Sequence, residues 1–381
     1  MTESEKLGLY IHIPFCRSRC AYCGFYSIEQ VPSQKFIDAL IREIQRKSKF
    51  FSHRSCDTVY FGGGTPSVLT VTQLNQIMSV LKSYFDILSD AEVTMEMNPC
   101  DMNYDYAAGV KALGINRVSI GVQSKENMLL KQIGRQHSAF DAKKAIKNAV
   151  KAGFTNISID LMCELPGQTV EDFQNTLYWA VHLPITHMSV YSLIIEEGTR
   201  FHYLDQKGIL ARPTEGESWH MYQDMCKILP HYGMERYEIS SFARKGYKSK
   251  HNTKYWVLDD YLGLGPAACS RIGRERRENL PGVKLYEKAL LSDEAIPEKI
   301  EKLSEKEEME EFCFLGLRQT VGISKGAFKK RYGKDIHVVY ERVIKKLIQE
   351  NFLKETDTHI YLTYQGMAHG NYAFEQFLVS V

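Results

Sequence analysis

The chain has 381 residues, of which 44% are hydrophobic and 25% are charged, and its formal net charge is +2. This length exceeds that of a typical single domain and predicts two domains, while the balanced charge excludes a global preference for nucleic acid or an anionic membrane. No run reaches transmembrane length, no signal-peptide segment precedes the first cysteine, and nine unevenly spaced cysteines indicate a reducing, cytoplasmic location.

Short β-branched or aromatic runs alternate with amphipathic stretches between Leu7 and Phe242, which is typical of a parallel βα-repeat. The predicted strands are Leu9–Pro14, Thr58–Phe61, Glu92–Met97, Arg117–Val122, Ile157–Met162 and His187–Leu193. Clear helical patterns follow at Gln34–Phe50 and Ala142–Ala152. Six such units fall short of the eight that close a barrel, so we expect an α/β fold with an open, partial (β/α)6 barrel. A doubly wound open sheet is the alternative, and either fold places the ligand beyond the carboxyl ends of the strands.

The βα rhythm stops after Phe242, where a stretch rich in glycine and charge leads to the charged segment Lys299–Glu311. We therefore expect one domain at residues 1–242 and a smaller α+β domain at residues 243–381. Within the second domain, residues of about 305–375 predict a winged-helix-like order. The predicted elements are helices at Glu307–Thr320, Lys325–Tyr332 and Val338–Glu350, then a hairpin of Phe352–Glu355 and His359–Thr363.

Winged helices often bind DNA, but the third predicted helix carries little excess positive charge. Its basic residues Arg342, Lys345 and Lys346 are offset by Glu341 and Glu350. Nucleic acid is therefore not an expected partner.

Three cysteines, Cys16, Cys20 and Cys23, follow directly after the first predicted strand. Iron–sulfur clusters are usually held by one cysteine thiolate per iron, so three thiolates on a four-iron cluster leave one iron open to a small molecule. The alternatives are a zinc site completed by His12 or a distant cysteine, a redox pair of Cys20 and Cys23, or plain buried thiols. A structural zinc site requires four ligands, which favours the cluster.

Polar or glycine-rich segments end several of the other strands. The second strand runs into Gly62-Gly63-Gly64-Thr65, the third ends near Glu96, the fourth at Gln123, and the fifth carries Asp160. Glycines permit a ligand to approach the backbone closely. A single strand-end carboxylate can simply be solvated, but recurrence at successive strand ends favours a binding site.

The C-x3-C-x2-C spacing, with Tyr22 just before the third cysteine, closely resembles the radical S-adenosylmethionine (SAM) superfamily. The resemblance implies a 4Fe-4S cluster on Cys16, Cys20 and Cys23, whose open iron chelates the amino and carboxylate groups of SAM. It also implies reductive cleavage of SAM to a 5′-deoxyadenosyl radical, and hence an electron donor such as flavodoxin or ferredoxin.

Over nearly the whole chain, the motifs further resemble the oxygen-independent coproporphyrinogen III oxidase group of that superfamily. The resemblance implies SAM contacts from Tyr10, Tyr22, Gly63, Gly64, Thr65 and Glu96. It implies a second cofactor or substrate pocket lined by Gln123, Arg135 and Asp160. The guanidinium of Arg135 suits a carboxylate, although a surface role is the alternative.

Two departures from that group matter. The oxidases continue after the third cysteine with Gly-Cys, whereas this chain reads Gly24-Phe25, and this moves the similarity towards the heme chaperones of the HemW type. A cysteine, Cys269, stands where the family pattern has histidine. Cysteine is itself a known heme ligand.

The segment His251-Asn252-Thr253-Lys254-Tyr255-Trp256 resembles the heme-binding signature of those chaperones. Imidazole and phenolate both ligate heme iron, and Trp256 offers a flat apolar face to a porphyrin. In a helix, His251 and Tyr255 would share a face at i, i+4 spacing. The alternative is that these residues hydrogen-bond the domain junction and fill the core.

Two functions of different classes follow. The first is a heme chaperone that binds heme and transfers it to a client protein. The second is an enzyme, an anaerobic coproporphyrinogen III dehydrogenase that decarboxylates two propionates by radical oxidation. Phe25 and the intact His251–Trp256 segment favour the chaperone. Heme degradation by a radical methyltransferase fits the scaffold but has no feature of its own.

Overall fold

The computed structural model describes residues 6–51 and 53–378. Its main feature is a curved sheet of twelve strands in the order β14-β13-β12-β11-β1-β4-β5-β6-β7-β8-β10-β9. The six strands in the middle of the sheet are parallel, and they are β1 (Lys6–Ile13), β4 (Ser55–Gly63), β5 (Asp86–Met97), β6 (Arg117–Gln123), β7 (Asn156–Cys163) and β8 (His187–Ser192). All six predicted strands are present, and the predicted partial barrel is confirmed.

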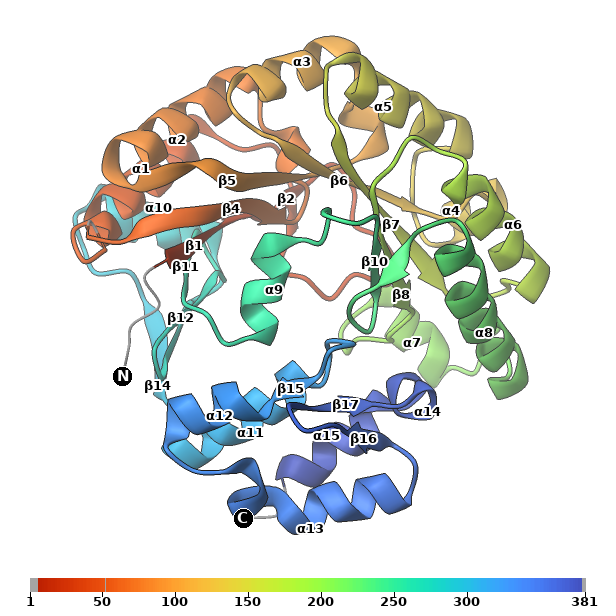
Figure 1. The fold of residues 1–381 in the computed structure, drawn as a ribbon. Coiled ribbons are helices and arrows are strands. Elements are labelled where there is room, and N and C mark those ends of the chain that lie inside the picture. Colours follow the sequence, from red (N-terminus) through yellow and green to blue (C-terminus); the bar gives the residue numbers. More distant parts are fainter. Residues whose placement is uncertain (1–5, 52, 379–381) are drawn as a thin grey trace.

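Helices cover the outside of this curved sheet (Figure 1). The long ones are α1 (Gln34–Ser48), α2 (Val71–Tyr84), α3 (Tyr104–Ala112), α5 (Ala139–Lys151), α6 (Val170–Val181) and α8 (Glu215–His231). Shorter helical segments are η1 (Pro66–Val68), η2 (Pro99–Asp101), α4 (Asn127–Gln132) and α7 (Arg200–Gln206). Side chains of Thr70, Ser138, Thr169 and Thr214 cap α2, α5, α6 and α8 in capping boxes, which explains where these helices begin.

The sheet continues past the six repeats at both ends. β9 (Glu235–Arg236) and β10 (Ser241–Ala243) extend it beyond β8, and β11 (Tyr261–Leu264) pairs in parallel with β1. β12 (Cys269–Ile272), β13 (Glu275–Asn279) and β14 (Glu298–Lys302) then add antiparallel strands. Local sequence did not predict these strands, because their pairing satisfies backbone groups on the open edge of β1, far away in the chain.

A second hydrophobic core begins at Met309 and continues to Phe377. Its elements are α11 (Glu305–Gly316), β15 (Ile323–Ser324), α12 (Lys325–Tyr332), α13 (Ile336–Gln349), β16 (Leu353–Glu355), β17 (His359–Leu362), α14 (Tyr364–Ala368) and α15 (Gly370–Leu378). Strands β16 and β17 form the predicted hairpin, and the predicted winged-helix-like order is confirmed. By contrast, α10 (Val283–Leu291) packs on the main core, so the sheet and its core extend past residue 242. The division at residues 242 and 243 stays a prediction.

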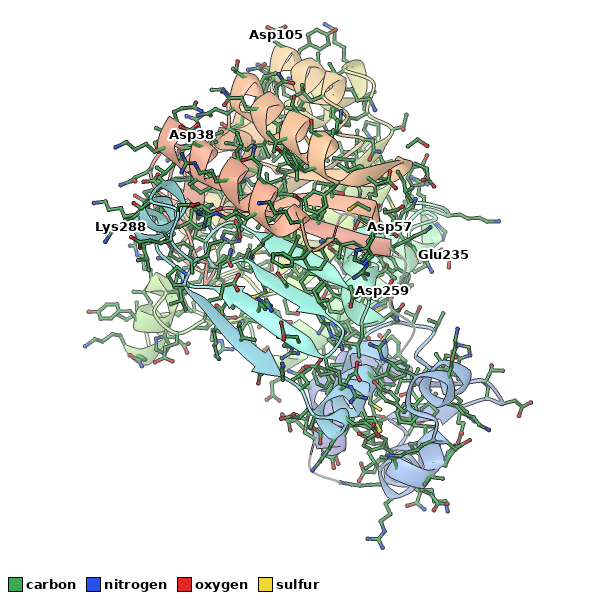
Figure 2. All side chains as sticks on the ribbon, turned by 90° about the vertical axis from the view of Figure 1, so that its left-hand side faces the viewer. Asp38, Asp57, Asp105, Glu235, Asp259 and Lys288 are labelled. Atoms are coloured by element: carbon green, nitrogen blue, oxygen red, sulfur yellow. The ribbon has the colours of Figure 1, made fainter. Side chains whose placement is uncertain are left out.

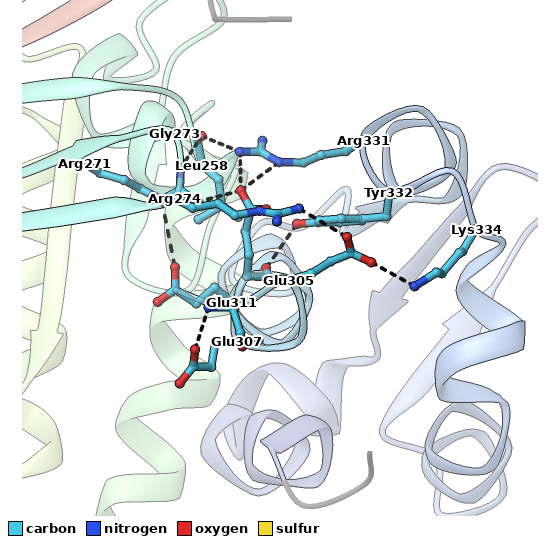
Figure 3. Close-up of polar contacts among 12 residues, drawn as sticks. Leu258, Arg271, Gly273, Arg274, Glu305, Glu307, Glu311, Arg331, Tyr332 and Lys334 are labelled. Carbon is cyan, nitrogen blue, oxygen red and sulfur yellow. Dashed lines mark hydrogen bonds and ion pairs between the residues drawn. The ribbon is translucent and has the colours of Figure 1, made fainter. Parts of the chain in front are cut away.

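The C-terminal unit is fastened to the sheet by buried charge. The carboxylate of Glu308 on α11 lies 3.1 Å from Arg271 Nη2, 2.7 Å from Arg274 Nε and 2.9 Å from Arg331 Nη2. Figure 3 shows these guanidinium groups converging beside α11 from the sheet and from α12. Removing one partner of such a buried network strands the others without a counter-charge. Glu308 therefore fixes the unit relative to the barrel.

Across residues 6–51 and 53–378, no helix has both the length and the apolar character required to span a membrane.

Candidate functional site

The cysteine loop lies beyond the carboxyl end of β1. Cys16 ends the short strand β2 (Phe15–Cys16), which pairs with β3 (Ile28–Glu29) and so closes the loop at its base. Cys16 is buried, whereas Cys20 and Cys23 are half-buried. The backbone N–H of Arg19 donates to Glu29 Oε1 at 2.8 Å, which holds the loop between its two ends. The three thiols are thus presented on one ordered loop.

Hydrogen-bond donors reach two of these sulfurs. Thr65 Oγ1 donates to Cys16 Sγ at 3.2 Å, and Arg135 Nη1 lies 3.6 Å from Cys20 Sγ. Burial raises the pKa of Cys23, and the neighbouring Cys20 and Cys16 raise it further. Thiolates crowded in this way need a strong positive partner to ionise. Three thiols with N–H and O–H donors at the sulfurs fit the surroundings that iron–sulfur clusters use.

His12 is one of the two residue types, the other being a distant cysteine, that the sequence offered to complete a zinc site. Its Nδ1 lies 3.0 Å from Tyr10 Oη, and its Nε2 lies 3.1 Å from the carbonyl oxygen of Tyr26. Both ring nitrogens are therefore occupied by hydrogen bonds. Among the residues described, no group of three or more His, Cys, Asp or Glu side chains, the three loop thiols included, is arranged to hold a metal ion.

The glycine-rich segment after β4 packs directly against the cysteine loop. A Cβ added to Gly64 would lie 2.8 Å from the carbonyl oxygen of Phe15, and one added to Gly63, whose φ is +110°, would lie 2.7 Å from the His12 ring. The backbone N–H of Thr65 donates to Phe15 O at 2.8 Å. Gly63 and Gly64 are therefore required for the close packing of this segment on the segment that contains His12 and Phe15. Gly62, which sequence reasoning did not single out, faces Tyr60, Tyr10 and Glu96 instead.

The predicted carboxylates, Glu96 and Asp160, lie on β5 and β7, the two strands that flank β6 in the sheet. Tyr60 Oη donates to Glu96 Oε1 at 2.8 Å, and Ser119 Oγ lies 3.2 Å from Asp160 Oδ1. Burial raises the pKa of Glu96 to about 7, although the hydrogen bond from Tyr60 opposes this. Burial also raises the pKa of Asp160, while Arg117 opposes that shift. The Asp160 carboxylate also raises the pKa of Glu96, because two like charges oppose each other's ionisation.

Arg135 joins the cysteine loop to the end of β6. Its Nη2 donates to the carbonyl oxygen of Gly121, close to the side chain of Gln123. Burial disfavours the charged guanidinium, but Tyr22 and Cys20 raise the pKa of Arg135. Gln123 has a φ of +68°, a conformation that non-glycine residues adopt rarely and mostly at functional sites. The structure thus brings Tyr22, Gln123 and Arg135 together beside Cys20.

Arg117 is a site residue that sequence reasoning missed. It begins β6 with 2% of its surface exposed, and its Nε has no hydrogen-bond partner in the described part of the chain. Its charge acts on Glu96, Asp160, His187 and His251. A buried arginine at the start of a strand has no sequence signal apart from its position in an apolar run.

The heme-signature segment forms α9 (Lys250–Trp256), which lies on the inner side of the curved sheet (Figure 1). Glu92 accepts the backbone N–H groups of Lys250 and His251, both at 3.1 Å, at the first turn of the helix. Lys254 Nζ lies 2.8 Å from Asp57 Oδ1 and 3.7 Å from Asp259 Oδ2, and Figure 2 shows these two carboxylates near each other. The helix is therefore anchored by charge at both ends.

His251 is fully buried, and both of its ring nitrogens have partners. Nδ1 lies 2.8 Å from Thr58 Oγ1, and Nε2 lies 2.8 Å from Tyr255 Oη. The imidazole also stacks on Tyr60 with the ring centroids 5.1 Å apart. Burial lowers the pKa of His251 to about 3, with Lys254 and Arg117 adding to the effect, so the ring is neutral. His251 and Tyr255 do share a helix face, and on that face their side chains hydrogen-bond to each other.

The other residues of the segment are more accessible. Tyr255 and Trp256 are half-buried, and the Arg318 guanidinium lies 4.5 Å from the centre of the Trp256 ring. Cys269 is exposed, and its charge acts on Tyr255 and Tyr261, so it lies in the same neighbourhood. The phenol of Tyr255 and the indole of Trp256 are therefore partly accessible on α9, with the Cys269 thiol in the neighbourhood of Tyr255.

Two family models match the chain: the radical SAM superfamily over residues 10–180, and the HemN C-terminal domain over residues 303–369. The heme chaperone HemW of Bacillus subtilis is 37% identical over 373 residues, which cover 97% of this chain and 98% of that protein. The heme chaperone HemW of Lactococcus lactis is 36% identical and covers 97% of each chain. A mitochondrial radical S-adenosyl methionine domain-containing protein 1 of Bos taurus is 34% identical over 84% of this chain and 75% of its own.

Among solved structures, the coproporphyrinogen III oxidase HemN of Escherichia coli, described as a radical SAM enzyme, superposes with a TM-score of 0.84. The match covers 99% of this chain and 91% of that chain, at 23% identity. At this identity the likeness shows a shared fold.

Proposed function

The chain belongs to the heme chaperone HemW family within the radical SAM superfamily, and on that premise we propose that it binds heme and transfers it to acceptor proteins in the cytoplasm. The observation that carries this proposal is the 37% identity to a heme chaperone HemW over 97% of this chain and 98% of the relative. Similarity over the full length of both proteins includes the C-terminal unit as well as the barrel.

Heme would bind beside α9, with Tyr255 as the better-placed iron ligand and Trp256 against the macrocycle. Tyrosine is an established heme ligand, and Tyr255 Oη lies 2.8 Å from His251 Nε2, a neutral imidazole that orients the phenol by a hydrogen bond. Burial raises the pKa of Tyr255 well above its usual value, with Tyr10 and Tyr261 adding to it, so ionisation requires the positive charge of the iron. Arg318, beside Trp256, suits a propionate carboxylate. In this arrangement His251 positions Tyr255.

The radical SAM superfamily implies a 4Fe-4S cluster and SAM, and we propose Cys16, Cys20 and Cys23 as the three cluster ligands. When bound, this group supplies one-electron chemistry at its open iron. Thr65 and Arg135 would donate hydrogen bonds to the ligating sulfurs and stabilise the reduced state. Tyr10, Tyr22, Gly63, Gly64, Thr65 and Glu96 would contact SAM, while Gln123, Arg135 and Asp160 would line the adjoining pocket. An electron donor such as flavodoxin or ferredoxin is a further proposed partner.

The test is to titrate heme into the purified protein and then offer a heme-free globin as acceptor. We expect a Soret band that transfers to the globin, and a changed band in Tyr255→Phe. If Tyr255→Phe and Cys269→Ala both retain the parent spectrum, neither Tyr255 nor Cys269 supplies the ligand. A parallel anaerobic assay with coproporphyrinogen III, SAM and reductant tests the enzyme alternative. Conversion of the porphyrinogen by a protein that binds no heme would replace the chaperone proposal.

A further inference from the structure

Strand β14 (Glu298–Lys302) ends the twelve-stranded sheet on one side, at the outer margin of the molecule in Figure 1. Its inner edge pairs with β13, and no other strand within residues 6–51 and 53–378 pairs with its outer edge. The opposite end of the sheet is β9, a strand of two residues. An uncovered edge presents unpaired backbone N–H and C=O groups, which can pair with a strand of another chain. The outer edge of β14 is therefore a candidate interaction surface.

The side chains of β14 alternate in charge, and most of them are available to a partner. The strand reads Glu-Lys-Ile-Glu-Lys, its last four residues are exposed, and Ile300 is 52% exposed. Glu298 is half-buried and already pairs with Lys47 Nζ at 2.9 Å and with Arg277 Nη1 at 3.4 Å. The other three charged side chains make no hydrogen bond or ion pair with the residues that the structure describes, and they are Lys299, Glu301 and Lys302.

The charge sequence of β14 is complementary to itself in one antiparallel register. When two copies pair about a two-fold axis at Ile300, this residue faces its own copy. Glu298 then faces Lys302 of the second copy, and Lys299 faces Glu301 of the second copy. Directly opposed side chains lie on the same face with Cβ atoms about 4.5–5.5 Å apart, so these opposite charges attract. An axis at any other residue of β14 sets a charged side chain against its own copy, because the other four residues are all charged.

We propose that β14 is a docking edge for a second copy of this chain, which pairs antiparallel about Ile300 and joins the two sheets into one. Charged residues on an edge strand usually prevent such pairing, because like charges of two copies repel each other. In the proposed register no like charges are directly opposed, so this protection is absent. The contact uses the same surface of both copies and therefore closes at a dimer. Two strands of five residues make a small interface, so the dimer is weak and forms at high protein concentration.

The experiment is sedimentation velocity of the full, heme-free chain at protein concentrations from about 1 μM to about 1 mM. The parent should shift from monomer to dimer, and added salt should weaken the dimer because the opposed charges are exposed. Ile300→Glu should weaken dimerisation by about tenfold or more, because two carboxylates then meet on the axis. Within its own chain position 300 faces Arg277 of β13, so the fold should accept the new carboxylate. Val338→Glu, at an exposed apolar position on α13, is the matched control.

Two single charge reversals test the register itself. Glu301→Lys makes positions 299 and 301 both positive, and Lys299→Glu makes them both negative, so each variant alone should stay monomeric. An equimolar mixture of the two should regain the dimer, because each positive position then faces a negative one. A parent that stays monomeric throughout, an Ile300→Glu variant that dimerises as the parent does, or a mixture that stays monomeric overturns the proposal. Circular dichroism and urea midpoints of each variant show that the fold is intact.

Discussion

Replacing His251 with alanine should destabilise the protein before any heme is added. The substitution removes the hydrogen-bond partner of the fully buried Thr58 Oγ1 and of Oη of the half-buried Tyr255, each 2.8 Å from a ring nitrogen. Leaving a buried polar group unpaired costs about 1–3 kcal/mol, so the two together predict a loss of at most about 2–6 kcal/mol. The lost stacking on Tyr60 adds to this. Total stabilities are about 5–15 kcal/mol, so the effect is large.

The assay is urea unfolding of the heme-free protein, followed by far-ultraviolet circular dichroism. Tyr255→Phe should show a smaller loss of about 1–3 kcal/mol, because it removes one hydrogen bond and leaves Nε2 unpaired. Asn252→Ala, a half-buried neighbour on the same helix, serves as the control and should stay near the parent. If His251→Ala has the parent's stability yet an altered heme spectrum, the imidazole is free in solution and ligates iron itself.

Three further predictions concern the cluster, the junction and pH. Cys20→Ala should abolish the roughly four irons per chain that a reconstituted cubane cluster contains, whereas Cys226→Ala should keep them. Equal iron content in the two variants would refute the ligand assignment. Glu308→Gln should cost up to about 3–5 kcal/mol, because the buried Arg271 then keeps only its longer, 3.9 Å ion pair with Glu311. Unchanged hydrogen exchange in the C-terminal unit would contradict this. Burial, with Arg117, holds the pKa of His187 well below its usual value, so the unfolded chain gains a proton below about pH 6.5 that the folded chain does not. The free energy of unfolding should therefore fall on acidification, by up to about 1.4 kcal/mol per pH unit from this group, and His187→Gln should reduce that slope. If the urea midpoint changes equally between pH 7.5 and pH 5.5 in the parent and in His187→Gln, this assignment is wrong.

The sequence by itself determined the elements whose signal is local. The strand β6 is buried at every position from Arg117 to Gln123, so its apolar run was readable directly. The helical pattern predicted at Gln34–Phe50 likewise corresponds to α1, which runs from Gln34 to Ser48. The position of Cys16, Cys20 and Cys23 beyond the first strand also followed, because a loop after a parallel strand must open at the carboxyl end of the sheet.

Tertiary structure decided which other part of the chain each helix face and each strand edge contacts. The i, i+4 spacing placed His251 and Tyr255 on one face, but that face could meet a porphyrin or the sheet. It meets Thr58, which is remote in sequence. In the same way, β11 became a strand because the free edge of β1 lies beside it, and its own residues carry a weak strand signal.

Long-range packing also created features that have no local pattern. Trp219 and His369 come from opposite ends of the second half of the chain, and only the docking of the C-terminal unit on α8 makes them parallel walls of one cleft. Glu308 and Arg271 are ordinary charged residues until both are buried at the junction. Local sequence sets the hydrophobic periodicity and the polarity of each helix or strand. The partners of a buried group depend instead on which surfaces the folded chain brings together.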